Sequence, residues 1–317
     1  MKIYRYILVC LIGILLSPIS CVMPFEPSGV KDTAGILVVE GMILETGTTI
    51  KLGRTVELYG TPKKESASGL AAVNNARVHV IDDKNHTVAV AILQNIDGSK
   101  SSIYVVQDTI TFIPGTKYAL SIQIGEKQYQ SAFVAPVRTP EIDEINWRYN
   151  EGESMDIMVS THDPDNETKY YRWEFEEDWE IRSKHFSTLR YELGTGKIIE
   201  QNLFSSNNRY YCWASDKSKS ILLGATARLT ETTIKNKIIH NFPVRSSRFS
   251  YLYSILVKQY GLDKNTYTYF ENLQKNIEQN GSIFAPQPTE LRGNIKCISH
   301  DERNIHKLYQ QYTGTIR

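Results

Sequence analysis

Short stretches in which apolar and polar residues alternate recur along the first part of the chain, and turn-forming residues separate them. Alternation with a period of two is typical of strands that bury one face. Turn pairs such as Pro114-Gly115 fall in the gaps between the stretches. Regular short strands without a helical period predict an Ig-like or fibronectin-like β-sandwich over residues 35–136. Its expected strands are residues 35–41, 49–52, 55–58, 76–81, 88–93, 102–106, 118–124 and 127–134.

A second, β-rich domain is predicted over residues 141–300. Pro136 and Pro140 bracket a short linker that leads into it. Within this domain, Tyr171, Trp173 and Phe175 place an apolar residue at every second position, which indicates a strand with one buried face. The expected strands are residues 143–147, 155–160, 169–175, 220–224 and 249–259.

One helix stands out in the second domain, near residues 264–279. Asp263 is a suitable N-cap, and the pair Asn280-Gly281 is a typical stop signal. An apolar stripe with helical spacing lies between them, and we expect it to pack into the core rather than to form a platform for a ligand. The stripe consists of Tyr267, Phe270, Leu273 and Ile277. The predicted fold is therefore mainly β, with one packed α-helix.

The first twenty residues have the pattern of a secretory signal peptide. Lys2 and Arg5 give a basic start, residues 7–16 are apolar, and Ser17-Pro18 breaks the run. The run is too short to cross a membrane, because a transmembrane helix needs roughly 20 apolar residues. We therefore expect residues 1–20 to be a cleaved leader.

Cys21 directly follows the small residue Ser20, an arrangement that resembles a bacterial lipobox. The resemblance implies that Cys21 becomes the first residue and carries acyl chains, and several chains anchor a protein far more firmly than one. Val22 in the next position favours the outer membrane, and the pattern leaves the periplasmic face and the cell surface open. Residues 21–34 would then form a tether. The alternative is an ordinary secreted protein with a cysteine at this position.

Charge argues against two classes of partner. The chain has 36 basic and 35 acidic residues, and loss of Lys2 and Arg5 with the leader leaves 34 basic residues. A nucleic-acid-binding protein needs a basic face, and peripheral docking on anionic lipid needs a polybasic patch. We therefore expect no nucleic acid among the partners.

Two of the four cysteines remain once the leader and Cys21 are set aside. Cys212 and Cys297 in an oxidising compartment are read most simply as one disulfide. The alternative is a pair of buried free thiols.

Motifs of catalysis, cofactor binding and metal binding are missing from the sequence, so we expect neither an enzyme nor a bound cofactor. The weak metal candidates are Asp163 and Asp165, whose carboxylates could bind Ca²⁺. The same Asp-Pro-Asp-Asn run suits a tight turn between strands, and the turn is the favoured interpretation.

Two further features bear on contacts with a partner. Residues 174–180 are rich in acidic side chains and are expected to form a solvated face, or alternatively to meet a basic patch on a partner. Most of the aromatic residues are expected in the core. Trp179, Tyr210 and Tyr211 lie near predicted loops and are the candidates for an exposed ligand or partner contact.

An ordered series of short motifs resembles the Bacteroidetes lipoproteins grouped as domain-of-unknown-function family 4249. The motifs are Cys21 with Pro24-Phe25-Glu26, Val38-Val39-Glu40-Gly41, Cys212-Trp213, Phe242-Pro243-Val244, residues 281–288, and Gly293 to Cys297. The polar tail at 301–317 departs from the family pattern, in which an apolar strand usually follows the last cysteine.

The resemblance implies an outer-membrane lipoprotein with an Ig-like domain and a β-rich domain, encoded beside TonB-dependent outer-membrane receptors. It implies no established catalytic residues, and it agrees with the disulfide between Cys212 and Cys297. We therefore expect a non-enzymatic, lipid-anchored accessory or substrate-capturing partner of a TonB-dependent receptor in nutrient uptake. The alternative is a structural or adhesive cell-surface protein.

Overall fold

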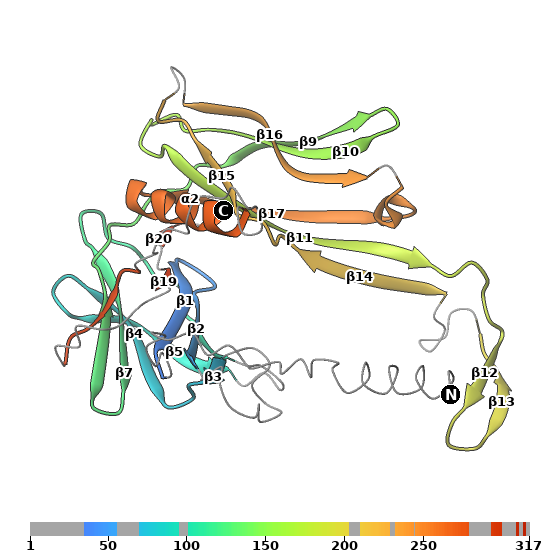
Figure 1. The fold of residues 1–317 in the computed structure, drawn as a ribbon, viewed down its shortest axis with the longest axis horizontal. Helices are drawn as coiled ribbons and strands as arrows, with labels where there is room; N and C mark the ends of the chain where they lie inside the picture. The colour runs from blue at the N-terminus through green and yellow to red at the C-terminus, as the bar shows by residue number, and fades with distance from the viewer. Residues whose placement is uncertain are drawn as a thin grey trace, which may run out of the picture. The chain divides into compact units, whose positions relative to one another are not determined.

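The computed structural model describes residues 35–55, 70–94, 101–202, 210–228, 232–243, 245–278 and 293–299, together with the backbone of short strands at 309–310 and 313–314. Residues Ala34–Arg317 form one compact unit. The described part is mainly β and contains one α-helix, α2, which confirms the predicted fold class (Figure 1).

The first sheet has eleven strands, in the order β18-β8-β7-β4-β5-β6-β2-β1-β19, with β3 on β2 and β20 on β1. All pairs are antiparallel except those of β19 and β20 with β1, which are parallel. The strands are β1 (Leu37–Leu44), β2 (Thr49–Thr55), β3 (Leu70–Ala72), β4 (Ala76–Asp82), β5 (Thr87–Gln94), β6 (Ser102–Val106), β7 (Tyr118–Ile124), β8 (Lys127–Ser131), β18 (Ile295–Cys297), β19 (Tyr309–Gln310) and β20 (Thr313–Gly314).

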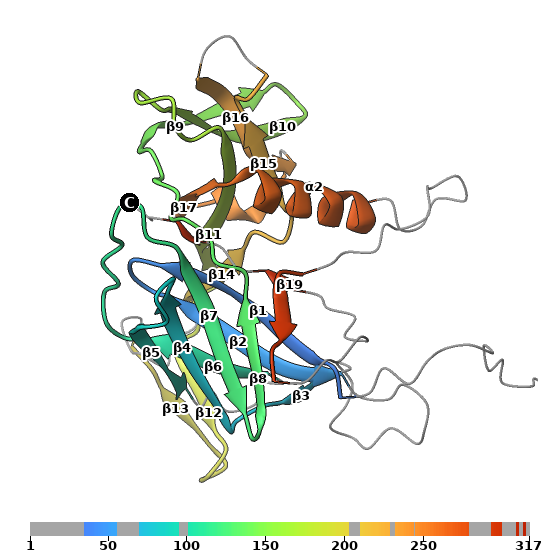
Figure 2. The ribbon, with the colours of Figure 1, turned by 90° about the vertical axis from the view of Figure 1, so that its left-hand side faces the viewer.

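This sheet curls around a single apolar core (Figure 2). Val39, Leu52, Val78, Leu120 and Tyr129 come from strands across its whole width and belong to one buried cluster. Because β2 pairs with β6 and β4 pairs with both β5 and β7, the hydrogen-bonded path has no break. An Ig-like sandwich would divide these strands between two sheets, so that finer expectation is not confirmed.

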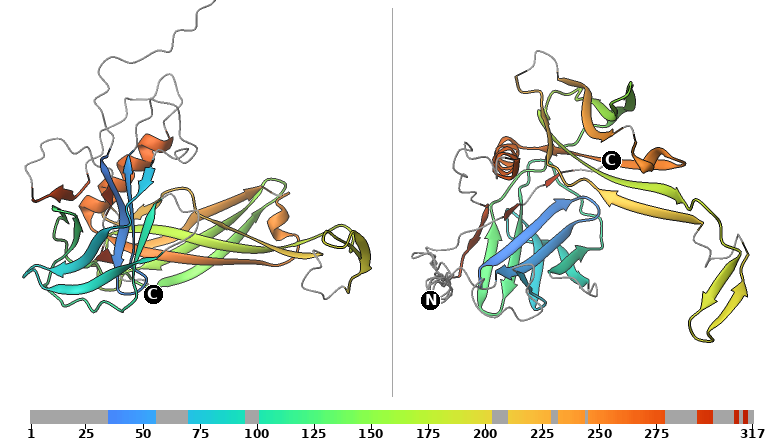
Figure 3. Two further views of the ribbon diagram at one scale, coloured as in Figure 1. Left: turned by 90° about the horizontal axis from the view of Figure 1, so that it is seen from below. Right: turned by 45° about the vertical axis from the view of Figure 1, so that its right-hand side comes forward.

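Two further sheets enclose a second core (Figure 3). A three-stranded sheet has the order β16-β10-β9, and a four-stranded sheet places β11 between β14, β15 and β17. Val159, Trp173, Phe242 and Val257 from these strands are buried together. The strands are β9 (Ile142–Asn150), β10 (Ser154–His162), β11 (Tyr170–Arg182), β14 (Tyr211–Lys217), β15 (Leu222–Ala225), β16 (Thr233–Pro243) and β17 (Tyr253–Leu262), and a 3₁₀ turn, η1, spans Ser247–Phe249.

The helix α2 (Lys264–Glu278) matches the predicted helix closely. The carboxylate of Asp263 accepts hydrogen bonds from the backbone N–H groups of Asn265 and Thr266, as an N-cap does. Phe270 is buried beside Tyr260 of β17, and Leu44 of β1 belongs to the same cluster. The predicted stop signal lies outside the described residues.

Candidate partner-binding surface

A short hairpin forms its own two-stranded sheet between β11 and β14 along the chain (Figure 1). It consists of β12 (Leu189–Glu192) and β13 (Lys197–Glu200). Tyr191 lies opposite Ile198 in the register, so these two side chains share a face with Leu189. Leu193 follows at the turn and is 91% exposed. None of these residues belongs to the buried apolar clusters of the described chain, so the hairpin presents an apolar face to solvent.

Aromatic side chains continue this surface at the base of the hairpin. The ring of Tyr210 lies between Phe186 and Tyr211, with centroid distances of 6.0 and 4.8 Å. The guanidinium of Arg182 lies over Tyr211 at 5.2 Å and over Tyr251 at 4.2 Å. Because Arg182 fixes these rings from one side, the aromatic group is held in place while much of it stays exposed.

Two of the residues predicted to contact a partner, Tyr210 and Tyr211, belong to this aromatic group. Tyr211 is about half exposed, and Tyr210 is half-buried. Trp213, two residues further along β14, is 61% exposed on the same face. We call Phe186, Leu189, Tyr191, Leu193, Ile198, Tyr210, Tyr211 and Trp213 the hairpin surface.

Trp179, the third aromatic candidate, has a different role. It lies within β11 rather than beside a loop, and the guanidinium of Arg248 covers its ring at 4.5 Å. Its indole N–H is buried and has no hydrogen-bond partner within the described chain. Trp179 thus belongs to an internal polar network rather than to the exposed surface.

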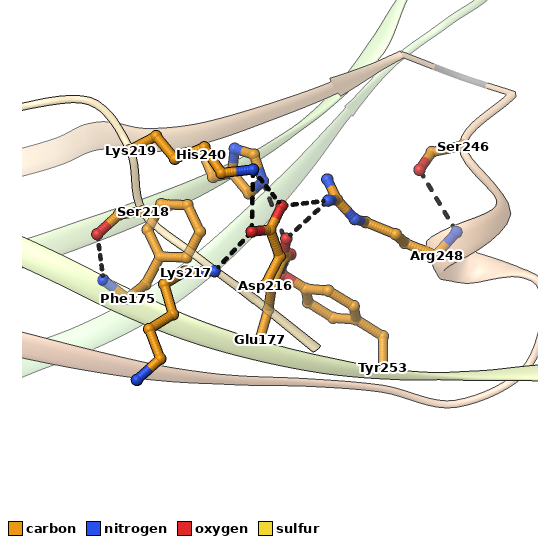
Figure 4. A network of polar contacts seen from close by, with 10 residues as sticks. All are labelled: Phe175, Glu177, Asp216, Lys217, Ser218, Lys219, His240, Ser246, Arg248 and Tyr253. Carbon is orange, nitrogen blue, oxygen red and sulfur yellow. Dashed lines mark hydrogen bonds and ion pairs between the residues drawn. The ribbon is translucent and has the colours of Figure 1, made fainter. Parts of the chain in front are cut away.

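That network is built around a buried carboxylate (Figure 4). Glu177 is 2% exposed and accepts a hydrogen bond of 2.9 Å from the hydroxyl of Tyr253. Nη2 of Arg248 lies 3.2 Å from Oε1 of Glu177 and 3.0 Å from Oδ2 of Asp216. Lys219 pairs with Asp216 at 3.1 Å. The ion pairs link β11 and β14 to η1.

Burial shifts the pKa values of two groups in this network, Glu177 and His240. It raises the pKa of Glu177 above its usual value, although the Tyr253 hydrogen bond and the charge of Arg248 act in the opposite direction. Burial and the nearby Arg248 charge lower the pKa of His240 to about 4. Nε2 of His240 lies 3.7 Å from Oε2 of Glu177, and it makes no hydrogen bond within the described chain. Both groups are therefore biased towards their neutral forms.

The acidic run does not form a uniformly solvated face, as the sequence pattern suggested. Glu177 and Glu180 are buried on opposite faces of β11. Glu176 is paired with Lys217 and Lys258, both at about 3 Å, and Glu174 is paired with Arg172. The run is neutralised mostly within the chain, which removes its basis as a patch for a basic partner.

The segment that begins at Asp163 forms a turn, which the sequence analysis favoured over a Ca²⁺ site. The Asp163 carboxylate accepts hydrogen bonds from the backbone N–H groups of Asp165, Glu167 and Thr168, and Asn166 adopts a φ of 55°. Asp165 pairs with Arg138 instead of turning towards Asp163. Within the residues that the structure describes, no group of three or more His, Cys, Asp or Glu side chains could hold a metal ion.

A polar cleft of about 450 Å³ lies next to this turn. His162 and Asp143 line it, with Nδ1 of His162 at 2.7 Å from the Asp143 carboxylate. Glu45, Arg138 and other residues complete its wall. Arg138, the other basic residue of the wall, is paired with Asp165.

Cys212 and Cys297 are not joined by a disulfide in the structure. Cys212 lies on β14 and Cys297 on β18, which belong to different sheets. The Sγ of Cys297 lies 3.6 Å from the hydroxyl of Ser299. The expected disulfide is therefore not present. Cys21, the expected lipid attachment residue, lies outside the described residues.

The sequence analysis missed the hairpin itself, although its pattern carries the signal. Tyr191 and Ile198 lie on either side of the Gly194-Thr195-Gly196 turn, and alternating residues around a glycine-rich turn are typical of a hairpin. The strand β9 was predicted in part, over residues 143–147, but the exposure of Ile145, Trp147 and Tyr149 along it was not.

The chain belongs to the family described as domain of unknown function DUF4249, which matches residues 22–305. This confirms the family resemblance. No curated protein matches the chain. Among the described residues, no helix is long and apolar enough to cross a membrane.

Proposed function

We propose that this chain is a non-enzymatic, lipid-anchored outer-membrane protein that binds a partner protein through the hairpin surface. The partner would be a TonB-dependent receptor, and the chain would assist nutrient uptake by capturing substrate or completing the receptor complex. The observation that carries the proposal is the set of large apolar side chains exposed on β12, β13 and their turn.

A free hairpin of this kind is physically unfavourable. An isolated two-stranded ribbon is at best marginally stable in water, and it needs a packing partner for independent stability. Leu189, Tyr191, Leu193 and Ile198 are each more than half exposed. Contiguous apolar patches on a protein surface mark interaction sites, so a bound partner supplies the contacts that the hairpin lacks.

The composition of the surface suits a protein partner. Tyr, Trp, Phe and Arg are enriched at the centres of protein interfaces, where a few of them carry most of the binding energy. Tyr211 and Trp213 provide such anchors, and Arg182 holds Tyr211 in place. A lipid anchor at Cys21 would confine the chain to the membrane that contains the receptor, which raises the effective concentration of the two.

Copurification from detergent-solubilised native membranes tests the proposal. The tagged wild-type chain should recover a TonB-dependent receptor, and the double variant Leu193→Ser with Ile198→Ser should recover at least about tenfold less. The matched control is Val90→Ser with Ile92→Ser, two exposed apolar residues on β5. It should recover the receptor as the wild type does. Absence of any receptor from the wild-type preparation would refute the partner assignment.

Two further measurements address the rest of the proposal. A labelled fatty acid fed to growing cells should appear on the wild-type chain and not on Cys21→Ala. If the intact chain binds a surface or matrix in a whole-cell assay and no receptor copurifies, the alternative adhesive role is favoured instead.

A further inference from the structure

The edge strand β9 carries exposed apolar side chains that are not part of the hairpin surface. It is the last strand of the three-stranded sheet in the part of the chain that the structure describes. Ile145, Trp147 and Tyr149 lie opposite Val159, Ile157 and Met155 of β10, so they continue the apolar inner face up to the edge. Trp147 is 67% exposed there. An edge strand with an uncovered apolar row is a template for pairing with another strand.

The charged residues on the polar face of β9 indicate which kind of strand can pair with this edge. Glu144 and Arg148 lie on this face, two positions on either side of Asn146. Arg148 donates to the buried carboxylate of Asp156 through Nη2, yet its side chain remains 55% exposed. A guanidinium has five N–H donors, so Arg148 can meet a second carboxylate. Glu144 has no ion pair among the described residues.

We propose that β9 pairs antiparallel with β9 of a second copy of this chain, about a two-fold axis that passes through Asn146. In this register Glu144 of each copy lies opposite Arg148 of the other, and Ile145 lies opposite Trp147. The interface is isologous, because each contact occurs twice. The two three-stranded sheets become one continuous sheet, and the apolar rows of the two copies lie side by side on one face of it.

Neighbouring registers fit less well. Directly opposed residues of paired strands point to the same face of the sheet, and a two-fold axis perpendicular to the sheet meets this condition when it passes through a residue of β9. The neighbouring registers are therefore those centred on Ile145 or on Trp147. Centring the pair on Ile145 sets Asp143 against Trp147 and leaves Glu144 opposite Asn146. Centring it on Trp147 sets Arg148 opposite Asn146. Only the register centred on Asn146 pairs both charges and both apolar residues, and such cross-strand pairs are favourable.

Cysteine cross-linking in native membranes tests the register directly. In the proposed dimer the two Asn146 side chains face each other, and directly opposed Cβ atoms are about 4.5–5.5 Å apart. Asn146→Cys should therefore give a disulfide-linked or short-reagent-linked dimer at twice the monomer mass. Tyr149→Cys is the matched control on the same strand, because residue 149 would face residue 143. It should give no more cross-link than the wild type.

A charge reversal tests the same interface without cysteine chemistry. Glu144→Lys would set two lysines against two arginines and should raise the dissociation constant of the dimer roughly tenfold or more in sedimentation of the purified full chain. The control is Glu126→Lys, the same change on the exposed turn between β7 and β8, which should leave the constant unchanged.

The inference does not depend on the receptor or on the lipid anchor. A monomer at every concentration tested, with no cross-link specific to residue 146, would overturn it. A cross-link from residue 146 to a different protein would also overturn it, because the occupant of the edge would then be a foreign strand.

Discussion

The indole N–H of Trp173 donates a hydrogen bond of 2.7 Å to the side-chain carbonyl of Gln259, inside the second core. Both residues are almost completely buried. The amide nitrogen of Gln259 donates in turn to the backbone carbonyl of Pro140 and to the hydroxyl of Thr161. One amide therefore satisfies polar groups on β11, on β10 and in the segment that leads into β9.

Replacing Gln259 by Met should lower the free energy of unfolding by about 2–3 kcal/mol, because the volume is kept and three buried polar groups lose a partner. Urea unfolding of the purified protein measures the change. Gln128→Met, at an exposed position on β8, should stay within about 0.5 kcal/mol of the wild type. Equal midpoints for the two variants would show that the Trp173 contact is not a significant source of stability.

Much of the fold was predictable from the sequence because burial on one face of a strand imposes a period of two. The predicted strands at 102–106 and 118–124 coincide with β6 and β7, and the predicted helix ends within one residue of α2. The strand β16 escaped prediction because Asn236 has a φ of 51° and the register with β10 shifts nearby. Such a bulge breaks the alternation on which the prediction depends.

The candidate surface was predictable only in part. Tyr210 and Tyr211 were recognised as aromatic residues near a loop, whereas Trp179 looked equivalent to them in the sequence. The difference comes from Arg248, which is 69 residues away along the chain and covers the ring of Trp179. Glu177 could have been placed inside, because it continues the inward row of Tyr171, Trp173 and Phe175 on β11.

Protonation of His240 should make the protein less stable in mild acid. Its pKa is lowered to about 4 in the folded chain, chiefly by burial, against an ordinary value near 6.5. Between these values the unfolded chain binds more protons, so the free energy of unfolding falls as the pH drops from 6.5 towards 4. Glu177 partly offsets this loss, because its raised pKa makes the folded chain take up a proton first.

The variant His240→Phe isolates the histidine contribution, since the new ring can keep the stacking with Phe175 and the tilted ring contact with Phe242. Relative to the wild type, we expect it to gain about 1–2 kcal/mol between pH 7.5 and pH 5. Chemical unfolding at both pH values measures this difference. If the difference in free energy of unfolding between the variant and the wild type is the same at both pH values, His240 is not the source of the pH dependence.

Two glycines of the curled sheet should respond in opposite ways to the same substitution. A Cβ on Gly41 would lie 2.7 Å from the carbonyl oxygen of Thr49 and 2.5 Å from Cδ1 of Ile50. Gly41→Ala should therefore lower the free energy of unfolding by about 1–3 kcal/mol, because the backbone of β2 has to shift.

Gly53 on β2 is the matched control, since a Cβ there would meet its nearest atoms at 3.6 Å, an ordinary contact distance. Gly53→Ala should be neutral or up to about 1 kcal/mol more stable, because the unfolded chain loses conformational freedom. Thermal or urea unfolding compares the two variants. The packing argument fails if both alanines have the same effect.

The two thiols of the described chain should remain unlinked in the native protein. Cys212 and Cys297 lie on different sheets, and Cys297 is part of β18, whose register with β8 sets Cys297 opposite Tyr129. A bridge requires the two Cα atoms to come within about 7 Å, and the structure forms no disulfide between these two strands.

Alkylation of the denatured protein without reductant, followed by peptide mass mapping, should find both cysteines modified. Cys212→Ser and Cys297→Ser should each unfold within about 1 kcal/mol of the wild type, whereas removal of a native disulfide typically costs 2–5 kcal/mol. The unfolding comparison distinguishes a bridge that stabilises the fold from a chance oxidation. A linked Cys212–Cys297 peptide together with a large loss of stability in both serine variants would restore the disulfide that the sequence pattern suggested.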